Sequence, residues 1–77
     1  MSYPIQLLVL HRAYCEREAS DGHSAMSLDD YLGYFCQFLD STSTDCSFFG
    51  FAIDSDDYVF MHDYVYRHIH DIEPSAL

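Results

Sequence analysis

The side chains in this sequence that could do chemistry are carboxylates, imidazoles and thiols, and their spacing fits no standard site. The segment Asp54-Ser-Asp-Asp57 begins like the loop of an EF-hand calcium site. Such a loop needs Gly at its sixth position and Glu at its twelfth, where this chain has Val59 and Val65. We therefore interpret these acids as the start of a helix, where the helix dipole favours negative charge.

The histidines do not form a recognisable metal site either. His68 and His70 point about 200° apart on a helix, so they bind one ion together only if the segment is a strand. His11 and Cys15 are four residues apart and could share a helix face, but they make half of a site whose second half is missing. The other two histidines, His62 and His23, do not form a metal-ligand spacing with these residues. We expect no metal ion and no cofactor.

Signatures of catalysis and of disulfide bonding are also missing from the sequence. No nucleophile elbow, glycine-rich phosphate loop or paired-carboxylate motif is present, so we expect no enzyme. The cysteines are odd in number and lack C-x-x-C spacing. Cys36 lies among apolar residues, which predicts a buried thiol rather than a disulfide and suits a reducing cytosol.

The charge is the most unusual property of the chain. It has thirteen acids and three arginines, no lysine, and a net charge of −10. Repulsion between like charges excludes nucleic acid and anionic membranes as direct ligands. A basic protein is the natural partner.

The acids are positioned by predicted helices, of which the segment from Ser27 to Asp40 is the clearest. Its apolar residues fall within an arc of roughly 140° on a helical wheel. They are Leu28, Tyr31, Leu32, Phe35, Cys36 and Leu39. Asp29, Asp30 and Asp40 lie on the other side, and Ser27 with Asp30 resembles a capping box. This pattern predicts an amphipathic helix with an acidic outer face.

Two further helices are predicted, one before this segment in the sequence and one after it. The first has Pro4 at its first helical position and ends near Gly22, a candidate left-handed cap, although 5–10 alone could be a buried strand. After a loop from Asp40 to Asp45, Ser55 and the acids that follow it are typical of a helix start. The last helix is predicted over 58–72. Its apolar stripe is Tyr58, Met61, Val65, Ile69 and Ile72, with Val59, Phe60, Tyr64 and Tyr66 off the stripe.

We therefore predict one α-dominant domain over residues 1–77, with three to four short helices. The alternative is an α+β fold in which 48–53 and 58–61 form a hairpin, because both are rich in aromatic and β-branched residues. No signal peptide or membrane span is recognisable, so we expect a protein of the cytoplasm. We also expect it to be a monomer.

The aspartates are the candidate partner-binding residues. They are Asp29, Asp30, Asp40, Asp45, Asp54, Asp56, Asp57, Asp63 and Asp71. Seven or eight helical residues separate some of them, which is roughly 10–12 Å and comparable to phosphate spacing on duplex DNA. A surface rich in acidic residues can also be an adaptation to high salt or a means of keeping the protein soluble. This chain, however, has many large aromatic residues, which we expect a salt-adapted protein to lack.

In its small size, high Asp content and lack of lysine the chain resembles the DNA mimics of phages and mobile elements, including anti-CRISPR proteins. That resemblance implies inhibition of a host defence complex, most specifically a type I CRISPR-Cas surveillance complex, by covering a basic DNA- or PAM-binding surface. The target would be a basic nucleic-acid-binding protein, possibly a Cas protein, in a bacterial cytoplasm. The alternative is an acidic adaptor or antitoxin-like module with an apolar contact face at Tyr34, Phe38, Val59 and Tyr66.

Overall fold

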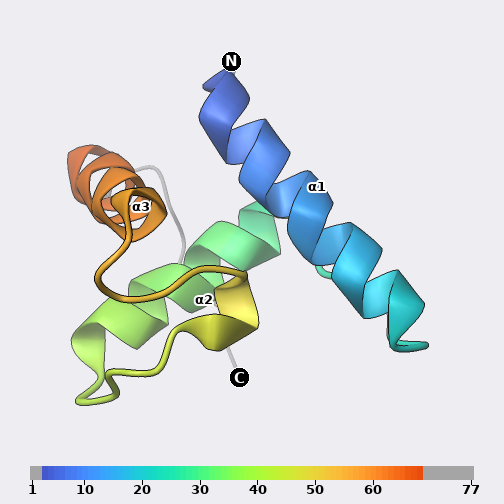
Figure 1. Cartoon of the computed structure of the whole chain (residues 1–77). Coiled ribbons are helices and arrows are strands. Elements are labelled where there is room, and N and C mark those ends of the chain that lie inside the picture. The colour runs from blue at the N-terminus through green and yellow to red at the C-terminus, as the bar shows by residue number, and fades with distance from the viewer. Residues whose placement is uncertain (1–2, 69–77) are drawn as a thin grey trace.

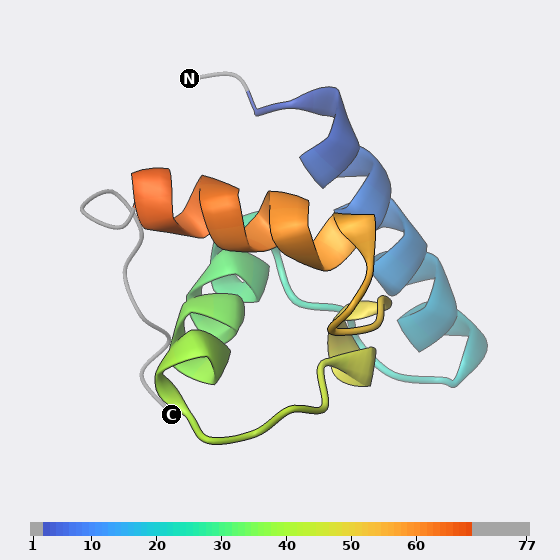
Figure 2. The same cartoon turned by 60° about the vertical axis from the view of Figure 1, so that its left-hand side comes forward.

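A computed structural model describes residues 3–68, which form three α-helices and one short 3-10 helix. These are α1 (Ile5–Ser20), α2 (Leu28–Asp40), η1 (Ser47–Phe49) and α3 (Asp56–Arg67). The helices cross one another instead of running side by side as a bundle (Figure 1). Figure 2 shows α3 passing across α2, which it contacts. The predicted α-dominant fold is confirmed, and the hairpin alternative is wrong because 58–61 lie inside α3.

Helix α1 is bounded by a proline and a glycine. Pro4 is the N-cap of α1, which begins at Ile5, so the helix starts one residue later than predicted. At the other end Gly22 has φ of 78°, and the His23 amide donates to the Glu18 carbonyl at 2.8 Å. This six-to-one bond is the mark of a Schellman cap and confirms the predicted role of Gly22. The strand alternative for 5–10 is wrong, because this segment is helical.

Helix α2 has the predicted division between its two faces. Ser27 caps it by accepting a hydrogen bond from the Asp30 amide at 3.3 Å. Of the six predicted core residues, four are buried and two, Leu28 and Leu39, are half-buried. Cys36 is buried as expected, and burial raises the pKa of its thiol.

The segment that the sequence left open between strand and helix contains η1. Gly50 ends this short helix with φ of 97°, a left-handed conformation that side chains other than glycine rarely adopt. Phe49 and Phe51 on either side of Gly50 are buried. The turn therefore lets two nearby aromatic rings enter the core without a strand.

Helix α3 begins at Asp56, directly after Ser55, which confirms the predicted helix start, although the apolar stripe was predicted over 58–72. Ser55 accepts a hydrogen bond from the Tyr58 amide at 3.2 Å. The rest of its predicted stripe, Ile69 and Ile72, lies outside the described residues. Met61 and Val65 are buried as predicted. Tyr64 is buried too, although it lies off the stripe, so the buried face of α3 is wider than the stripe. Its long side chain lies over the preceding turn and reaches the core from the edge of the helix.

Tyr31 lies at the centre of the core. It is 0% exposed, and its ring lies 4.9 Å from Tyr14 of α1 and 5.6 Å from Phe49 of η1, measured between ring centroids. Its hydroxyl donates a 2.7 Å hydrogen bond to the Phe49 carbonyl. Burial raises the pKa of this hydroxyl well above its ordinary value. One side chain of α2 thus contacts both α1 and η1.

Replacing Tyr31 by Phe should lower the free energy of unfolding by about 1–3 kcal/mol, because the Phe49 carbonyl would be left without its donor in the core. Urea denaturation measures this change. Tyr66→Phe is the matched control, since Tyr66 is 55% exposed, and it should stay within about 0.5 kcal/mol of wild type. Equal stability of the two variants would contradict the structural role of the Tyr31 hydroxyl.

Candidate functional site

The structure describes eight of the nine candidate aspartates, and Asp71 lies outside the described residues. Seven of the eight are exposed and one, Asp57, is half-buried. Exposure leaves these carboxylates available to a partner. They do not, however, form one continuous group in the structure.

Two of the acids are held against the start of α1. The Tyr3 hydroxyl donates to Asp29 at 2.8 Å, and the Gln6 side-chain amide donates to Asp57 at 3.3 Å. The hydrogen bond to Asp29 is the main cause of a raised pKa at Tyr3. Asp29 is in the first turn of α2 and Asp57 is in the first turn of α3. The fold therefore brings two acidic helix starts, distant in sequence, to the first turns of α1.

Asp30 and Asp56 lie in the same first turns as Asp29 and Asp57, and Asp54 lies in the turn that precedes α3. The other three candidate acids lie elsewhere. Asp40 is at the opposite end of α2 from Asp29, roughly 16 Å away along the helix axis. Asp45 lies in the connection to η1 and accepts the Ser47 amide at 3.0 Å, and hydrogen bonds from Ser47 lower the pKa of its carboxyl. Asp63 is on α3 and pairs with Arg67 at 2.8 Å. The acids thus form a group at the start of α1 and scattered positions beyond it.

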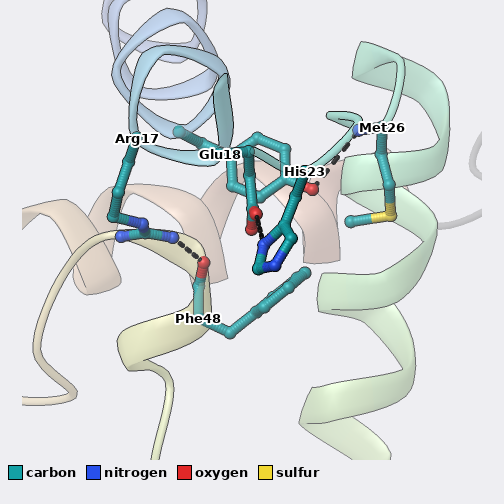
Figure 3. Close-up of polar contacts among 6 residues, drawn as sticks. Arg17, Glu18, His23, Met26 and Phe48 are labelled. Carbon is teal, nitrogen blue, oxygen red and sulfur yellow. Dashed lines mark hydrogen bonds and ion pairs between the residues drawn. The ribbon is translucent and has the colours of Figure 1, made fainter. Parts of the chain in front are cut away.

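All three arginines of the chain have partners within the protein, two of them four residues away and one about thirty residues away. Arg12 pairs with Glu16 at 3.3 Å, in the same i,i+4 arrangement that joins Arg67 to Asp63. Arg17 donates to the backbone carbonyls of Ser47, at 3.3 Å, and of Phe48, so it supports η1 (Figure 3). Within residues 3–68, arginine therefore neutralises only two carboxylates.

A cluster that sequence reasoning missed lies at the end of α1. The Glu18 side chain is only 11% exposed, and its carboxylate lies 2.9 Å from Nδ1 of His23 (Figure 3). Asp21 completes the cluster, whose three ligand-type atoms lie within 4.8 Å of one another. The cluster borders an open pocket of about 690 Å³, lined also by Tyr34 and Phe48. The sequence feature that could have predicted this cluster is Gly22, because a glycine that ends a helix turns the chain and brings residue 23 back to residue 18.

The other pair singled out as half of a metal site does meet in the fold. The Cys15 sulfur lies 3.5 Å from Nε2 of His11, on a shared face of α1 as predicted. Nε2 also lies 2.9 Å from the Met26 carbonyl. No third acid, histidine or cysteine of residues 3–68 joins this pair in a group that could hold an ion.

An exposed apolar stripe on α1 was also missed. Its members are Ile5, Leu8 and Val9, which are 78%, 46% and 59% exposed. They fall within an arc of about 100°, opposite the buried residues of the same helix. The nearly continuous apolar run over 5–10 could have predicted this stripe. A helix at the surface buries only one face, so some residues of such a run must be exposed.

The apolar face expected from sequence is formed only in part. Val59 and Tyr66 are exposed, at 64% and 55%. Tyr34 and Phe38 are half-buried and pack against the core. An apolar contact surface is therefore better supplied by α1 than by those four residues together.

No family model matches this chain, and neither does any curated protein or solved structure. Among the helices of the described region, none has the length and apolar character needed to cross a membrane. The site must therefore be interpreted from its own geometry.

The lowered pKa of Asp45 predicts an acid-side loss of stability. A carboxyl whose pKa is lower in the folded state stabilises the fold above its unfolded pKa, and this contribution is lost as the pH falls through the folded value. Carboxyl NMR titration should place the Asp45 inflection below the ordinary value of 3.8. Ser47→Ala removes the hydroxyl but keeps the amide, so it should reduce the shift without reversing it. An unshifted pKa at Asp45 in wild type would contradict the hydrogen bonds from Ser47.

Proposed function

We propose that this chain is an acidic protein inhibitor that binds the DNA-contacting surface of a basic nucleic-acid-binding protein. One observation carries the proposal. All three arginines are engaged within the protein and pair with only two carboxylates of residues 3–68, while seven candidate aspartates are exposed on the folded surface. Such a surface attracts cationic side chains over distances comparable to the Debye length.

The placement of the acids supports mimicry of DNA in particular. Asp29 and Asp40 are separated by roughly 16 Å along α2, and Asp56 and Asp63 by roughly 10 Å along α3. Helices hold these carboxylates at fixed intervals, as a duplex holds its phosphates. A basic channel that binds DNA could therefore bind two or more of these acids at once.

The resemblance to phage and mobile-element inhibitors suggests the kind of target. We propose a nucleic-acid-binding complex of a bacterial defence system, with a type I CRISPR-Cas surveillance complex as the most specific candidate. The protein would act in the host cytoplasm as a monomer, without catalysis and without binding nucleic acid or membrane itself. Competition between this chain and DNA for one basic surface would be its mechanism.

A second candidate function is an acidic adaptor or antitoxin-like module. The observation that favours it is the exposed apolar stripe of Ile5, Leu8 and Val9 on α1, the helix near whose start Tyr3 and Gln6 contact two acids. Charge complementarity points to a basic protein with an apolar contact ridge. A second copy of this chain is a poor occupant because both copies carry a net charge of −10.

Neutralising the acidic start of α3 tests the mimicry proposal. The triple variant Asp54→Asn, Asp56→Asn and Asp57→Asn keeps side-chain size while removing three charges. Affinity for the target should fall by about 1 kcal/mol or more for each charge that meets a cation, and less at the rim. A gel shift of the target on its DNA, with inhibitor titrated in, measures the loss. The triple variant Asp29→Asn, Asp30→Asn and Asp40→Asn tests α2 in the same way.

The matched control for charge is the double variant Glu16→Gln and Asp21→Asn, which removes two acids outside the candidate set. It should compete with DNA nearly as well as wild type. If both triple variants also compete like wild type, the carboxylates do not replace phosphates and the mimicry proposal is wrong.

Replacing Leu8 and Val9 by Gln tests the adaptor alternative. Gln is a good helix former, and both positions are exposed, so thermal stability should change little. If the stripe is the contact surface, partner affinity measured by titration calorimetry should fall by about 1–3 kcal/mol. The double variant Val59→Gln and Tyr66→Gln removes exposed apolar area from α3 and serves as the control. Retention of binding by the α1 variant would favour mimicry over the adaptor.

A further inference from the structure

We propose that Glu18, Asp21 and His23 form a binding site for a divalent transition-metal ion of the Zn²⁺ class. This inference is independent of the proposed function and departs from the expectation that the chain binds no metal. Its basis is the cluster at the end of α1, where one imidazole nitrogen and two carboxylates lie together. Zn²⁺ commonly takes three such protein ligands and completes its coordination with water.

The backbone of the cluster is fixed before any ion binds. All three residues belong to the Schellman cap, in which the His23 amide donates to the Glu18 carbonyl and the Gly22 amide donates to the Ala19 carbonyl at 3.1 Å. The left-handed Gly22 turns the chain so that residue 23 faces residue 18. Little ordering of the backbone is then needed on binding, which limits its entropic cost.

The side-chain distances are close to those of a metal site. Glu18 and His23 already place a carboxylate oxygen and Nδ1 at 2.9 Å, a few tenths of an ångström less than the roughly 3.3 Å that separates neighbouring ligands around a tetrahedral zinc ion with bonds of about 2.0–2.1 Å. A carboxylate oxygen of Asp21 lies within 4.8 Å of the ligand atoms of Glu18 and His23, and the Asp21 side chain is exposed. Rotation of its free side chain completes the set without moving the core.

The electrostatics of the cluster also favour a cation. Glu18 is a mostly buried carboxylate, and burying a charge costs free energy unless a partner compensates for it. The C-terminal end of α1 adds the negative pole of its helix dipole. Arg17 lines the same pocket, but its guanidinium donates to the carbonyls of η1 (Figure 3) and does not neutralise the cluster.

The donor set selects the class of metal. An imidazole ligand suits zinc, cobalt, nickel and iron, whereas calcium and magnesium prefer oxygen ligands alone. The pocket beside the cluster is open, so water or a group from a partner can reach the remaining coordination positions. We therefore expect Zn²⁺ and Co²⁺ to bind one per chain, and Mg²⁺ to bind far more weakly.

Titration calorimetry with Zn²⁺ and absorption spectroscopy with Co²⁺, both on the full chain, test the site. Each of Glu18→Gln, Asp21→Asn and His23→Gln should weaken binding by about tenfold or more. Asp21→Asn is the safest variant for the fold, because Asp21 is exposed and its side chain makes no hydrogen bond within the described residues. Circular dichroism checks that each variant is folded. Glu16→Gln and His62→Gln are the matched controls and should bind like wild type.

Three results would overturn the proposal. The first is the absence of saturable binding by wild type at millimolar Zn²⁺. The second is binding that survives all three site substitutions, or that is lost equally in the controls. The third is a thiolate-to-cobalt charge-transfer band, which would assign the ion to a cysteine such as Cys15 instead of to this cluster.

Discussion

The hydrogen bond from the Tyr31 hydroxyl to the Phe49 carbonyl is the contact on which the rest of the arrangement depends. It joins α2 to η1 inside the core, where a lost hydrogen bond cannot be replaced by water. The Tyr31 ring also packs against Tyr14, so α1 is fixed by the same residue. Once η1 is placed in this way, Arg17 reaches its carbonyls and one wall of the pocket at the end of α1 is formed.

The protein combines a strongly aromatic core with a surface whose charged side chains are mostly acidic. Aromatic rings bury a large apolar area per residue, which offsets the repulsion among thirteen acids in a chain of this size. The arginines do little to reduce that repulsion. Two form exposed i,i+4 pairs, which stabilise a helix only slightly, and the third binds backbone carbonyls. The unneutralised charge is thus a property of the folded surface and not only of the composition.

The acidic surface and the proposed metal site are separate parts of the molecule with different physical requirements. Recognition of a basic partner needs exposed charges at suitable intervals and tolerates some mobility. A metal site needs a few ligands held in fixed geometry, and the Schellman cap at Gly22 fixes the backbone that carries Glu18 and His23. The apolar stripe at Ile5, Leu8 and Val9 adds a third surface, on the helix near whose start Tyr3 and Gln6 contact Asp29 and Asp57.

Local patterns in the sequence determined the helices and their ends. Ser27, Ser55 and Gly22 act within four or five residues of themselves, so their roles as caps were predictable. The amphipathic pattern of α2 likewise fixed which of its faces is buried. Tertiary structure decided the rest, because it depends on residues distant in sequence. Only packing between helices could bury Tyr64, place Asp29 and Asp57 beside the first turns of α1, and leave the apolar stripe of that helix exposed.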